Sequence, residues 1–359
     1  MKRLLTIVGA RPQIIKAAAI SREIKNHYAD RVEELILHTG QHYDDNMSDM
    51  FFRELGIPAP DYNLHVGSME RDAQIRNMVA GIENVLDKNT FDAIIVYGDT
   101  NSTLAGALAA SKRQIPLYHI EAGLRSFNPA MPEEINRIET DKLSTVLFAP
   151  TQTAVRNLEN EQIMGRVVLS GDVMYDNALY FSRLAATKSN IIERMGLEPD
   201  KFVLATIHRP VNTDNETNLQ TIFRALTDIA AEGMEVVVPL HPRTRARMGK
   251  DARVGNVKII EPVGFYDIIR LEQSASVVMT DSGGVQKEAF FYGTPSVILR
   301  AETEWVEITD AGAGILAEAD YARIMAAYKT IAGKKIVFPP LFGDGHAAEH
   351  ILKEIVAEG

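Results

Sequence analysis

The stretch that decides the fold is residues 115–137, Ile-Pro-Leu-Tyr-His-Ile-Glu-Ala-Gly-Leu-Arg-Ser-Phe-Asn-Pro-Ala-Met-Pro-Glu-Glu-Ile-Asn-Arg. Its first six residues are typical of a buried strand that ends at Glu121. A loop follows, and Glu133 and Glu134 open a helix directly after Pro132, because proline suits a first helical turn. Ligands of open α/β sheets bind beside the carboxyl ends of strands, so the stretch predicts a site.

Two structural roles compete with chemistry for these charges. Glu133 and Arg137 are four residues apart, which is the spacing of an ordinary ion pair on one helix face. Acidic residues in a first turn also stabilise the helix dipole. Taken alone, the stretch leaves both interpretations open.

The bulk composition predicts a two-domain, soluble globular protein. A chain of 359 residues exceeds the usual size of one core. A net charge of −10 argues against a nucleic-acid partner or an anionic membrane surface. With no cysteine, disulfides, thiolate nucleophiles and cysteine-based zinc sites are excluded. The N-terminal apolar run is too short for a signal peptide and no run is long enough to span a membrane, so we expect a cytoplasmic enzyme or binding protein.

Apolar runs alternate with segments of helical period in both halves of the chain, which is typical of parallel βαβ units. We expect strands over 4–8, 35–39, 93–97, 117–120 and 146–149, a linking strand over 167–170, and strands over 202–206, 236–240, 257–260, 277–280 and 296–299. The predicted fold is α/β, with two Rossmann-like domains facing across a cleft. The predicted boundaries are 1–170, 171–345 and a C-terminal helix over 346–359. No Gly-x-Gly-x-x-Gly follows the first strand, so nicotinamide dinucleotide binding is not supported.

The sharpest local motif is Asp-Ser-Gly-Gly-Val-Gln-Lys-Glu over 281–288, where a strand passes through a glycine turn into a helix. Backbone N–H groups at such a helix start bind phosphate, and Gly283 and Gly284 let it approach closely. Ser282 adds a hydroxyl donor, and Glu288 is placed to bind a ribose diol. The competing interpretation is an ordinary N-cap followed by a glycine turn.

Other polar residues follow strand ends in both halves. Arg11 and Lys16 open the first helix, and Asp99 lies in an acidic turn where it is either an N-cap or a site residue. His208 and His241 each end a strand and are each followed within two positions by arginine. Surface charge and structural histidine are the alternatives. Together with the two motifs above, these residues suit a nucleotide diphosphate ligand and acid/base chemistry.

The chain resembles the non-hydrolysing UDP-N-acetylglucosamine 2-epimerase family. The matching pieces, in the family's order, are Gly-Ala-Arg-Pro-Gln-Ile-Ile-Lys (9–16), Gly-Gln-His (40–42), Tyr-Gly-Asp-Thr-Asn-Ser-Thr (97–103), His-Ile-Glu-Ala-Gly-Leu-Arg (119–125), Pro-Glu-Glu-Ile-Asn-Arg (132–137), His-Arg (208–209), the 281–288 motif and Gly-Asp-Gly (343–345). The resemblance implies a GT-B fold, a homodimer, and inversion at C2 of a UDP-linked 2-acetamido sugar for cell-surface polysaccharide precursors.

The resemblance also implies a mechanism. UDP is eliminated to leave a 2-acetamidoglucal and is then added back with the proton on the other face; no step needs a metal or a nicotinamide. The implied acid/base residues are Asp99, Glu121 and Glu133, with His208 assisting the departing diphosphate. The implied binding residues are Arg11, Lys16, Ser282, Gly283, Gly284 and Glu288. Further candidate binding residues at strand ends and in the matched motifs are Gln41, His42, Arg125, Arg209, His241 and Arg300.

The chain departs from the family at two places. Tyr43 and Asp44 replace an arginine and a glutamine that bind a second, activating substrate, which bears on allosteric activation. Trp305 replaces an arginine of the usual Thr-Glu-Arg-Pro-Glu. Both features resemble a branch that includes 2-epimerases of UDP-2,3-diacetamido-2,3-dideoxyglucuronate. The extra carboxylate of that sugar needs a cation, for which the candidates are Arg125, Arg243 and Arg245.

Four other functions remain open at this stage. The first is the same chemistry on the diacetamido uronate, which changes only the pocket. A GT-B glycosyltransferase would also use the 281–288 motif, but it has no need for three carboxylates beside a histidine. A non-catalytic nucleotide-sugar sensor would bind without turnover. A hydrolysing epimerase would release the free sugar.

Overall fold

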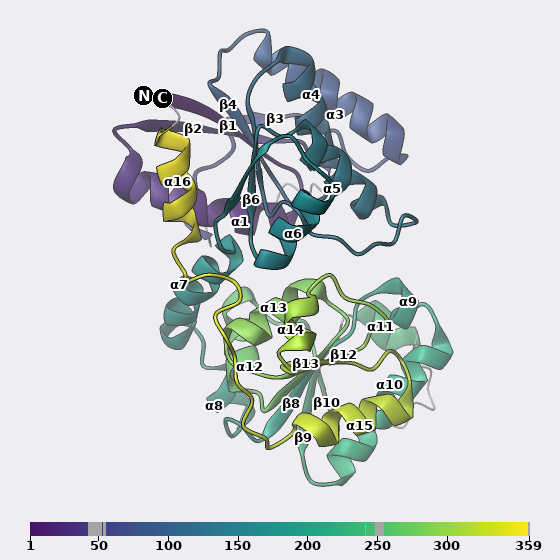
Figure 1. The fold of residues 1–359 in the computed structure, drawn as a ribbon. Coiled ribbons are helices and arrows are strands. Elements are labelled where there is room, and N and C mark those ends of the chain that lie inside the picture. The colour runs from purple at the N-terminus through teal and green to yellow at the C-terminus, as the bar shows by residue number, and fades with distance from the viewer. Residues whose placement is uncertain (42–51, 53–54, 241, 248–254, 358–359) are drawn as a thin grey trace. The chain divides into compact units, whose positions relative to one another are not determined.

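The computed structural model describes residues 1–41, 52, 55–240, 242–247 and 255–357. The chain forms two compact units, one of Met1–Asn177 with Pro340–Gly359 and one of Ala178–Pro339. Each unit is built on one parallel sheet (Figure 1). Two Rossmann-like α/β sheets are therefore confirmed, whereas the domain boundaries drawn from the sequence stay a prediction.

The first unit contains a sheet in the order β3-β2-β1-β4-β5-β6-β7. Its strands are β1 (Lys2–Val8), β2 (Val32–His38), β3 (Tyr62–Asn63), β4 (Ala93–Tyr97), β5 (Leu117–Ile120), β6 (Val146–Ala149) and β7 (Arg166–Leu169). The order reverses between β1 and β4, which makes the carboxyl ends of these strands a topological switch point. The strand expected to link the halves is β7, and it pairs with β6 at the sheet edge.

The helices of the first unit follow the predicted alternation. They are α1 (Arg11–Glu23), which continues as one π-helical segment (Ile24–Tyr28), α3 (Arg71–Leu86), α4 (Asn101–Arg113), α5 (Pro132–Leu143), α6 (Gln152–Asn160) and α16 (Ala347–Ala357). The sequence pattern placed the start of α1 at residue 14, three residues too late. Gln13 explains the difference, because its Oε1 accepts hydrogen bonds from the N–H groups of Gly9 and Ala10, at 2.9 and 3.2 Å.

The second unit repeats the architecture with a sheet in the order β10-β9-β8-β11-β12-β13. Its strands are β8 (Phe202–Thr206), β9 (Glu235–Pro239), β10 (Lys258–Ile260), β11 (Val277–Thr280), β12 (Ser296–Ile298) and β13 (Gly314–Leu316). Its helices are α8 (Ile191–Met195), α9 (Pro210–Thr213), α10 (Glu216–Ala231), α11 (Pro242–Arg247), α12 (Phe265–Ser274), α13 (Gly283–Phe291), α14 (Val306–Asp310) and α15 (Tyr321–Ile331). Here the order reverses between β8 and β11, so α13 begins at the switch point.

Each sheet has its own buried core. In the first unit, alternate residues of β1 and β4, such as Leu5, Ile7 and Ile94, pack with α3 and α4. In the second, Val203 and Val236 pack with α10 and α15. Among the described residues, every helix is too short or too polar to cross a lipid bilayer.

The chain passes from the first unit to the second along α7 (Val173–Lys188) and returns to the first as α16. In α16, Ile351, Leu352 and Ile355 are buried. The two oxygens of Asp176 accept hydrogen bonds from the N–H groups of Ala347 and Ala348, at 3.0 and 2.8 Å. Burial raises the pKa of the Asp176 carboxyl from 3.8 to about 6, although these two hydrogen bonds act in the opposite direction.

We therefore predict that Asp176 makes the stability of the first unit depend on pH. The folded state binds this proton more tightly than the unfolded chain, so its contribution is complete below about pH 4 and is lost as pH rises through about 6. Between pH 4 and 7.5, the free energy of unfolding of wild type should fall by about 1–2 kcal/mol relative to that of Asp176→Asn, after allowance for partial exposure. The measurement is urea unfolding followed by circular dichroism, because the single tryptophan, Trp305, lies in the second unit. If the difference in free energy of unfolding between wild type and Asp176→Asn does not change with pH, the raised pKa of Asp176 is contradicted.

Candidate active site

Asp99 and Glu121 follow the adjacent strands β4 and β5, so the sheet itself brings them together. Gly98 and Glu121 both have left-handed backbones, with φ of 62° and 70°. A left-handed backbone is unfavourable for glutamate, and such strain gathers at functional sites. It persists here because the N–H of Gly98 donates to Ile120 O at 3.0 Å and the N–H of Glu121 donates to Phe148 O at 3.1 Å.

Glu121 forms an ion pair with Lys16 of α1. The ammonium contacts Oε2, and the two side chains are only 12% and 7% exposed. A Cβ atom at Gly98 would lie 2.8 Å from Lys16 Nζ and 3.1 Å from Glu121 Oε2. Glycine is thus needed at position 98 both for its backbone and to leave room for this pair.

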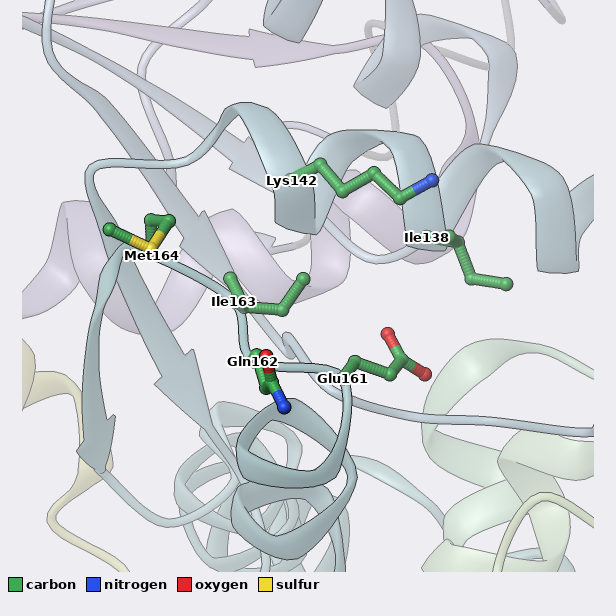
Figure 2. Close-up of a pocket in the computed structure, with 6 residues that line it drawn as sticks. All are labelled: Ile138, Lys142, Glu161, Gln162, Ile163 and Met164. Carbon is green, nitrogen blue, oxygen red and sulfur yellow. The ribbon is translucent and has the colours of Figure 1, made fainter.

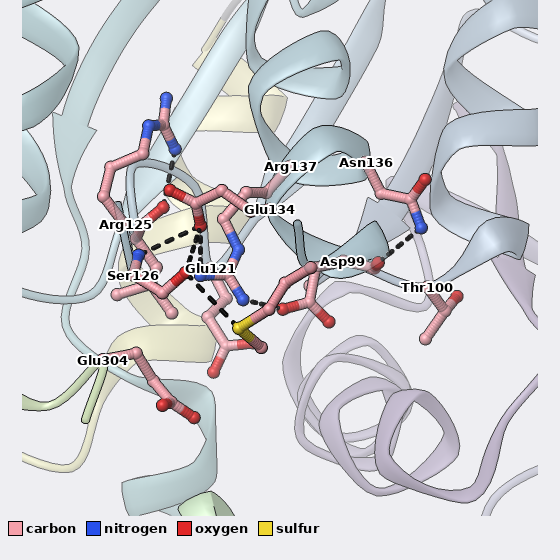
Figure 3. A network of polar contacts seen from close by, with 12 residues as sticks. Asp99, Thr100, Glu121, Arg125, Ser126, Glu134, Asn136, Arg137 and Glu304 are labelled. Atoms are coloured by element: carbon pink, nitrogen blue, oxygen red, sulfur yellow. Dashed lines mark hydrogen bonds and ion pairs between the residues drawn. The ribbon is translucent and has the colours of Figure 1, made fainter. Parts of the chain in front are cut away.

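Asp99 is not the N-cap of α4, which corrects one of the two roles considered for it. The cap is Thr100, whose hydroxyl accepts from the N–H of Thr103 at 3.3 Å. The Asp99 carboxylate instead pairs with Arg137 of α5, and its carbonyl accepts from Asn136 Nδ2 at 2.9 Å (Figure 3). Its side chain stays 31% exposed, so it remains accessible to a ligand.

The two glutamates that open α5 have different environments. Glu134 is 2% exposed, and its Oε2 lies 2.9 Å from Arg137 (Figure 3). It also accepts from the N–H groups of Ser126 and Phe127, at 3.0 and 2.9 Å, which anchors the loop before the helix. Glu133, the predicted acid/base residue, is exposed. Arg137 therefore joins the buried Glu134 to Asp99.

Arg125 is buried among carboxylates of the protein. Its Nε and Nη2 each lie 2.7 Å from an oxygen of Glu161, and its Nη1 lies 2.8 Å from Asp141 Oδ2. Although burial lowers the pKa of Arg125, the bonds with Glu161 and Asp141 outweigh it and the pKa is raised. The expectation that Arg125 binds the sugar gains no support, because its nitrogens are engaged inside the unit.

Sequence reasoning missed a buried histidine beside this arginine. His119 and Asp141 are both fully buried, with Nδ1 and Oδ1 2.7 Å apart. His119 lies inside the quoted stretch, but it looked like one more strand residue. Asp141 lies 22 residues later, in the last turns of α5, and no spacing pattern in the sequence connects the two.

A pocket of about 410 Å³ lies on the first unit (Figure 2). Ile138 and Lys142 of α5 line it together with residues 161–164 of the turn before β7. Its lining includes Glu161, which holds Arg125. None of the predicted catalytic residues lines it, so we do not assign it to the reaction.

In the second unit, His208 and Asp281 follow the adjacent strands β8 and β11. His208 Nδ1 lies 3.0 Å from Asp281 Oδ1; the histidine side chain is 62% exposed and the aspartate is fully buried. A carboxylate on Nδ1 fixes the proton there and leaves Nε2 to face a ligand. The sequence placed Asp281 in a phosphate motif but gave no sign of this pairing.

Asp281 holds the whole turn after β8. It accepts from the N–H groups of His208 and Arg209, both at 3.1 Å, and from Asn212 Nδ2 at 3.0 Å. Burial alone raises the pKa of Asp281, but the bonds from His208 and Asn212 together outweigh it, and the pKa is lowered. Asp281 is therefore an ionised partner for His208.

The 281–288 motif forms the start of α13, as predicted. Ser282 is the N-cap, with its Oγ 3.4 Å from the N–H of Val285. A Cβ atom at Gly283 would lie 2.3 Å from Glu304 Oε1, so a larger residue there would displace the Glu304 carboxylate. Glu304 in turn pairs with Arg300 at 3.0 Å. The N-cap interpretation is thus correct, and an N-cap is compatible with a phosphate at the same helix start.

Glu288 is half-buried and lies beside a second carboxyl group, Glu272 of α12. Burial, and then the nearby charge of Glu288, raise the pKa of Glu272 well above its usual value. Of the other candidates, Arg11 and Arg245 are exposed and Arg209 is the residue before α9. Gln41 is buried and accepts from Ser102 Oγ at 2.7 Å. The candidates His42, Tyr43, Asp44 and His241, and the side chain of Arg243, lie outside the described residues.

The pairing around Arg137 predicts a large loss of stability when its charge is removed. Arg137→Met leaves the buried carboxylate of Glu134 without its cation, which costs about 3–5 kcal/mol. The matched control is Lys142→Met on the same helix, where the pair with Glu139 is half-exposed and contributes about 0–1 kcal/mol. Urea unfolding followed by circular dichroism compares the two. Equal losses would show that Glu134 does not depend on Arg137.

Comparison with known proteins identifies the family. The model of the family described as UDP-N-acetylglucosamine 2-epimerase matches residues 23–356. A UDP-2,3-diacetamido-2,3-dideoxy-D-glucuronate 2-epimerase of Pseudomonas aeruginosa is 47% identical over 353 residues, 97% of this chain and 98% of the relative. The crystal structure of Methanocaldococcus jannaschii UDP-GlcNAc 2-epimerase, in complex with UDP-GlcNAc and UDP, is 38% identical with a TM-score of 0.87, covering 99% of this chain and 100% of that one.

The fold extends beyond the epimerases. A spinosyn rhamnosyltransferase complexed with thymidine diphosphate has a TM-score of 0.60 at 15% identity, over 99% of this chain and 96% of that one, so the likeness is one of fold alone. These matches confirm an α/β, GT-B-like fold with two Rossmann-like sheets. By its family model and its relatives, the chain belongs to the UDP-N-acetylglucosamine 2-epimerase family.

Proposed function

We propose that this protein inverts C2 of a UDP-linked 2-acetamido hexosamine by eliminating UDP and adding it back, without hydrolysis. The observation that carries the proposal is the acidic cluster at the ends of β4 and β5. Asp99 and Glu121 occupy the matching family motifs, and each is held by a cation of the same unit, Arg137 or Lys16. Carboxylates held in fixed positions in this way suit proton transfer at a sugar carbon.

The chemistry explains why a base alone is not enough. The C2 proton has no neighbouring carbonyl group, so its direct removal is difficult. In the proposed elimination, a carboxylate takes this proton, a C1–C2 double bond forms, and the C1–O bond breaks with its electrons leaving on UDP. Re-addition forms the C1–O bond again and delivers a proton to the opposite face of C2. The protein must therefore supply both acid/base groups and groups that stabilise the departing diphosphate.

We assign acid/base work to Asp99, Glu121 and Glu133 of the first unit. Lys16 and Arg137 hold the first two in place through their ion pairs. Glu133 is exposed at the start of α5, where a carboxylate can meet a ligand.

We assign the nucleotide to the second unit. The start of α13, with Ser282, Gly283 and Gly284, suits the diphosphate, and Glu288 suits the ribose. Asp281 holds Nδ1–H of His208, so Nε2 faces a ligand, and an imidazolium at this position donates from Nε2 to the departing phosphate oxygen. Arg11 is a further candidate for binding the diphosphate.

Two sugars are candidates for the substrate. Interconversion of UDP-GlcNAc and UDP-ManNAc is supported by the relative whose complex contains UDP-GlcNAc and UDP. The UDP-2,3-diacetamido uronate is supported by the 47% identity to an epimerase named for it. It is also supported by Trp305, because that branch resembles this chain in replacing the usual arginine at this position. The ammonium of Lys287 lies over the Trp305 ring, 4.0 Å from its centre. A homodimer is implied by the family resemblance and is part of the proposal.

Proton NMR in D₂O, with no added metal, tests the reaction and the substrate together. With the right UDP-sugar, deuterium should replace the C2 proton while the signals of the C2 epimer appear. Glu121→Gln should lose this exchange at C2, because its amide cannot take a proton, yet it should still bind UDP. Exchange with only one sugar identifies the substrate.

Two outcomes would contradict this assignment. Epimer formation without deuterium at C2 would exclude a proton-transfer mechanism. No exchange and no epimer with either sugar, together with sugar transfer to an added acceptor, would favour the glycosyltransferase alternative.

The pairing of Asp281 with His208 predicts a specific kinetic defect. Asp281→Asn removes the charge that fixes the His208 tautomer, so we expect kcat to fall by about 10²-fold or more with a smaller change in KM. The control is Asp267→Asn, the same change at a partly exposed ion pair with Arg194 in the same unit, which should leave kcat unchanged. A loss confined to KM would instead assign Asp281 to ligand binding.

A further inference from the structure

Gly98, the residue that joins β4 to Asp99, is held by hydrogen bonds at both of its backbone groups. Its N–H donates to Ile120 O at 3.0 Å, and its carbonyl lies 2.8 Å from His119 Nε2. A Cβ atom on Gly98 would collide with the Lys16–Glu121 pair. The position of this one peptide therefore sets where Asp99 begins and how closely Lys16 and Glu121 approach.

The ring of His119 faces a hydrogen-bond acceptor at each nitrogen. The Gly98 carbonyl has no proton to give, so Nε2 must donate to it. Nδ1 lies 2.7 Å from Asp141 Oδ1, and the ring and the carboxylate are both fully buried. A neutral imidazole has a single N–H, so it satisfies only one of these two contacts when Asp141 is ionised.

Asp141 is held as a carboxylate by its other partners. Its Oδ2 accepts from the N–H of Gly123 at 3.2 Å and lies 2.8 Å from Arg125 Nη1. Both of these groups donate, and neither accepts, so they favour an ionised oxygen. Arg125 is itself fixed by two 2.7 Å bonds to Glu161. In this row, which is buried except for Glu161 at its surface end, cationic His119 makes the count of positive and negative charges equal.

We propose that His119 is a positioning residue, donating from both ring nitrogens as a buried imidazolium that fixes the Gly98 peptide between Asp99 and Glu121. It holds β4 through the Gly98 carbonyl and α5 through Asp141. Since β5 carries Glu121 two residues later, one ring ties together all three elements that bear the acidic cluster. The assignment of this cluster to proton transfer rests on the proposed function, whereas the two hydrogen bonds do not.

Nitrogen NMR of histidine tests the proton count directly and without substrate. In wild-type protein labelled with ¹⁵N at its nine histidines, both ring nitrogens of His119 should show the shift of a protonated nitrogen at pH 7.5. Its signals are assigned by their loss in His119→Gln or, if that variant does not fold, by nuclear Overhauser contacts to β5. A ring nitrogen with the shift of an unprotonated nitrogen would overturn the proposal.

Kinetics then test the positioning role. His119→Gln keeps a side-chain N–H for the Gly98 carbonyl but loses the charge and the second fixed donor. We expect kcat for C2 exchange to fall about 10- to 100-fold, with KM within about 3-fold, because the nucleotide-binding groups are untouched. The control is His350→Gln, the same change at a half-exposed site on α16. An unchanged kcat would overturn the role. A rise in KM as large as the fall in kcat would overturn it too. Exchange by wild type in the same assay shows whether the proposed function itself holds.

Discussion

The acidic cluster of the first unit depends on the buried cations that hold its carboxylates in place. An ionised carboxylate taken out of water is costly unless a cation and hydrogen bonds replace its solvent. Glu121 has Lys16, and Glu134 shares Arg137 with Asp99. Lys16 lies on α1 and Arg137 on α5, so their pairs with Glu121 and Asp99 also fix each helix to the end of a strand. The position of the acidic cluster and the stability of the unit therefore have one cause.

In the proposed reaction the two units have different tasks, and buried charge pairs position the groups for both. Elimination of UDP needs groups that accept a proton and groups that accept charge on a leaving diphosphate. The first unit holds its carboxylates with cations and leaves Asp99 partly exposed. The second unit uses the buried, ionised Asp281 to orient the exposed His208 beside a helix start. Each sheet thus places one kind of chemistry at its own switch point.

Much of the fold was predictable because local rules determine it. Alternating apolar runs and the glycine turns predicted both parallel sheets apart from the edge strands β3 and β13, and the order of motifs predicted the family. The errors were local. Asp99 was considered as a cap, although Thr100 has that role, and the start of α1 was missed because Gln13 replaces the expected cap. The pairs His119–Asp141 and His208–Asp281 join residues 22 and 73 positions apart, so only the register of neighbouring strands and helices reveals them.

The most direct test of the account is whether the bond between C1 of the sugar and UDP breaks during inversion at C2. The measurement is positional isotope exchange, with ¹⁸O in the oxygen that bridges the sugar and the phosphate. Over many turnovers, elimination and re-addition should move part of the label into non-bridging positions of the same phosphate. Complete epimerisation with all of the label still in the bridge would contradict the account, because C2 would then invert while UDP stays attached.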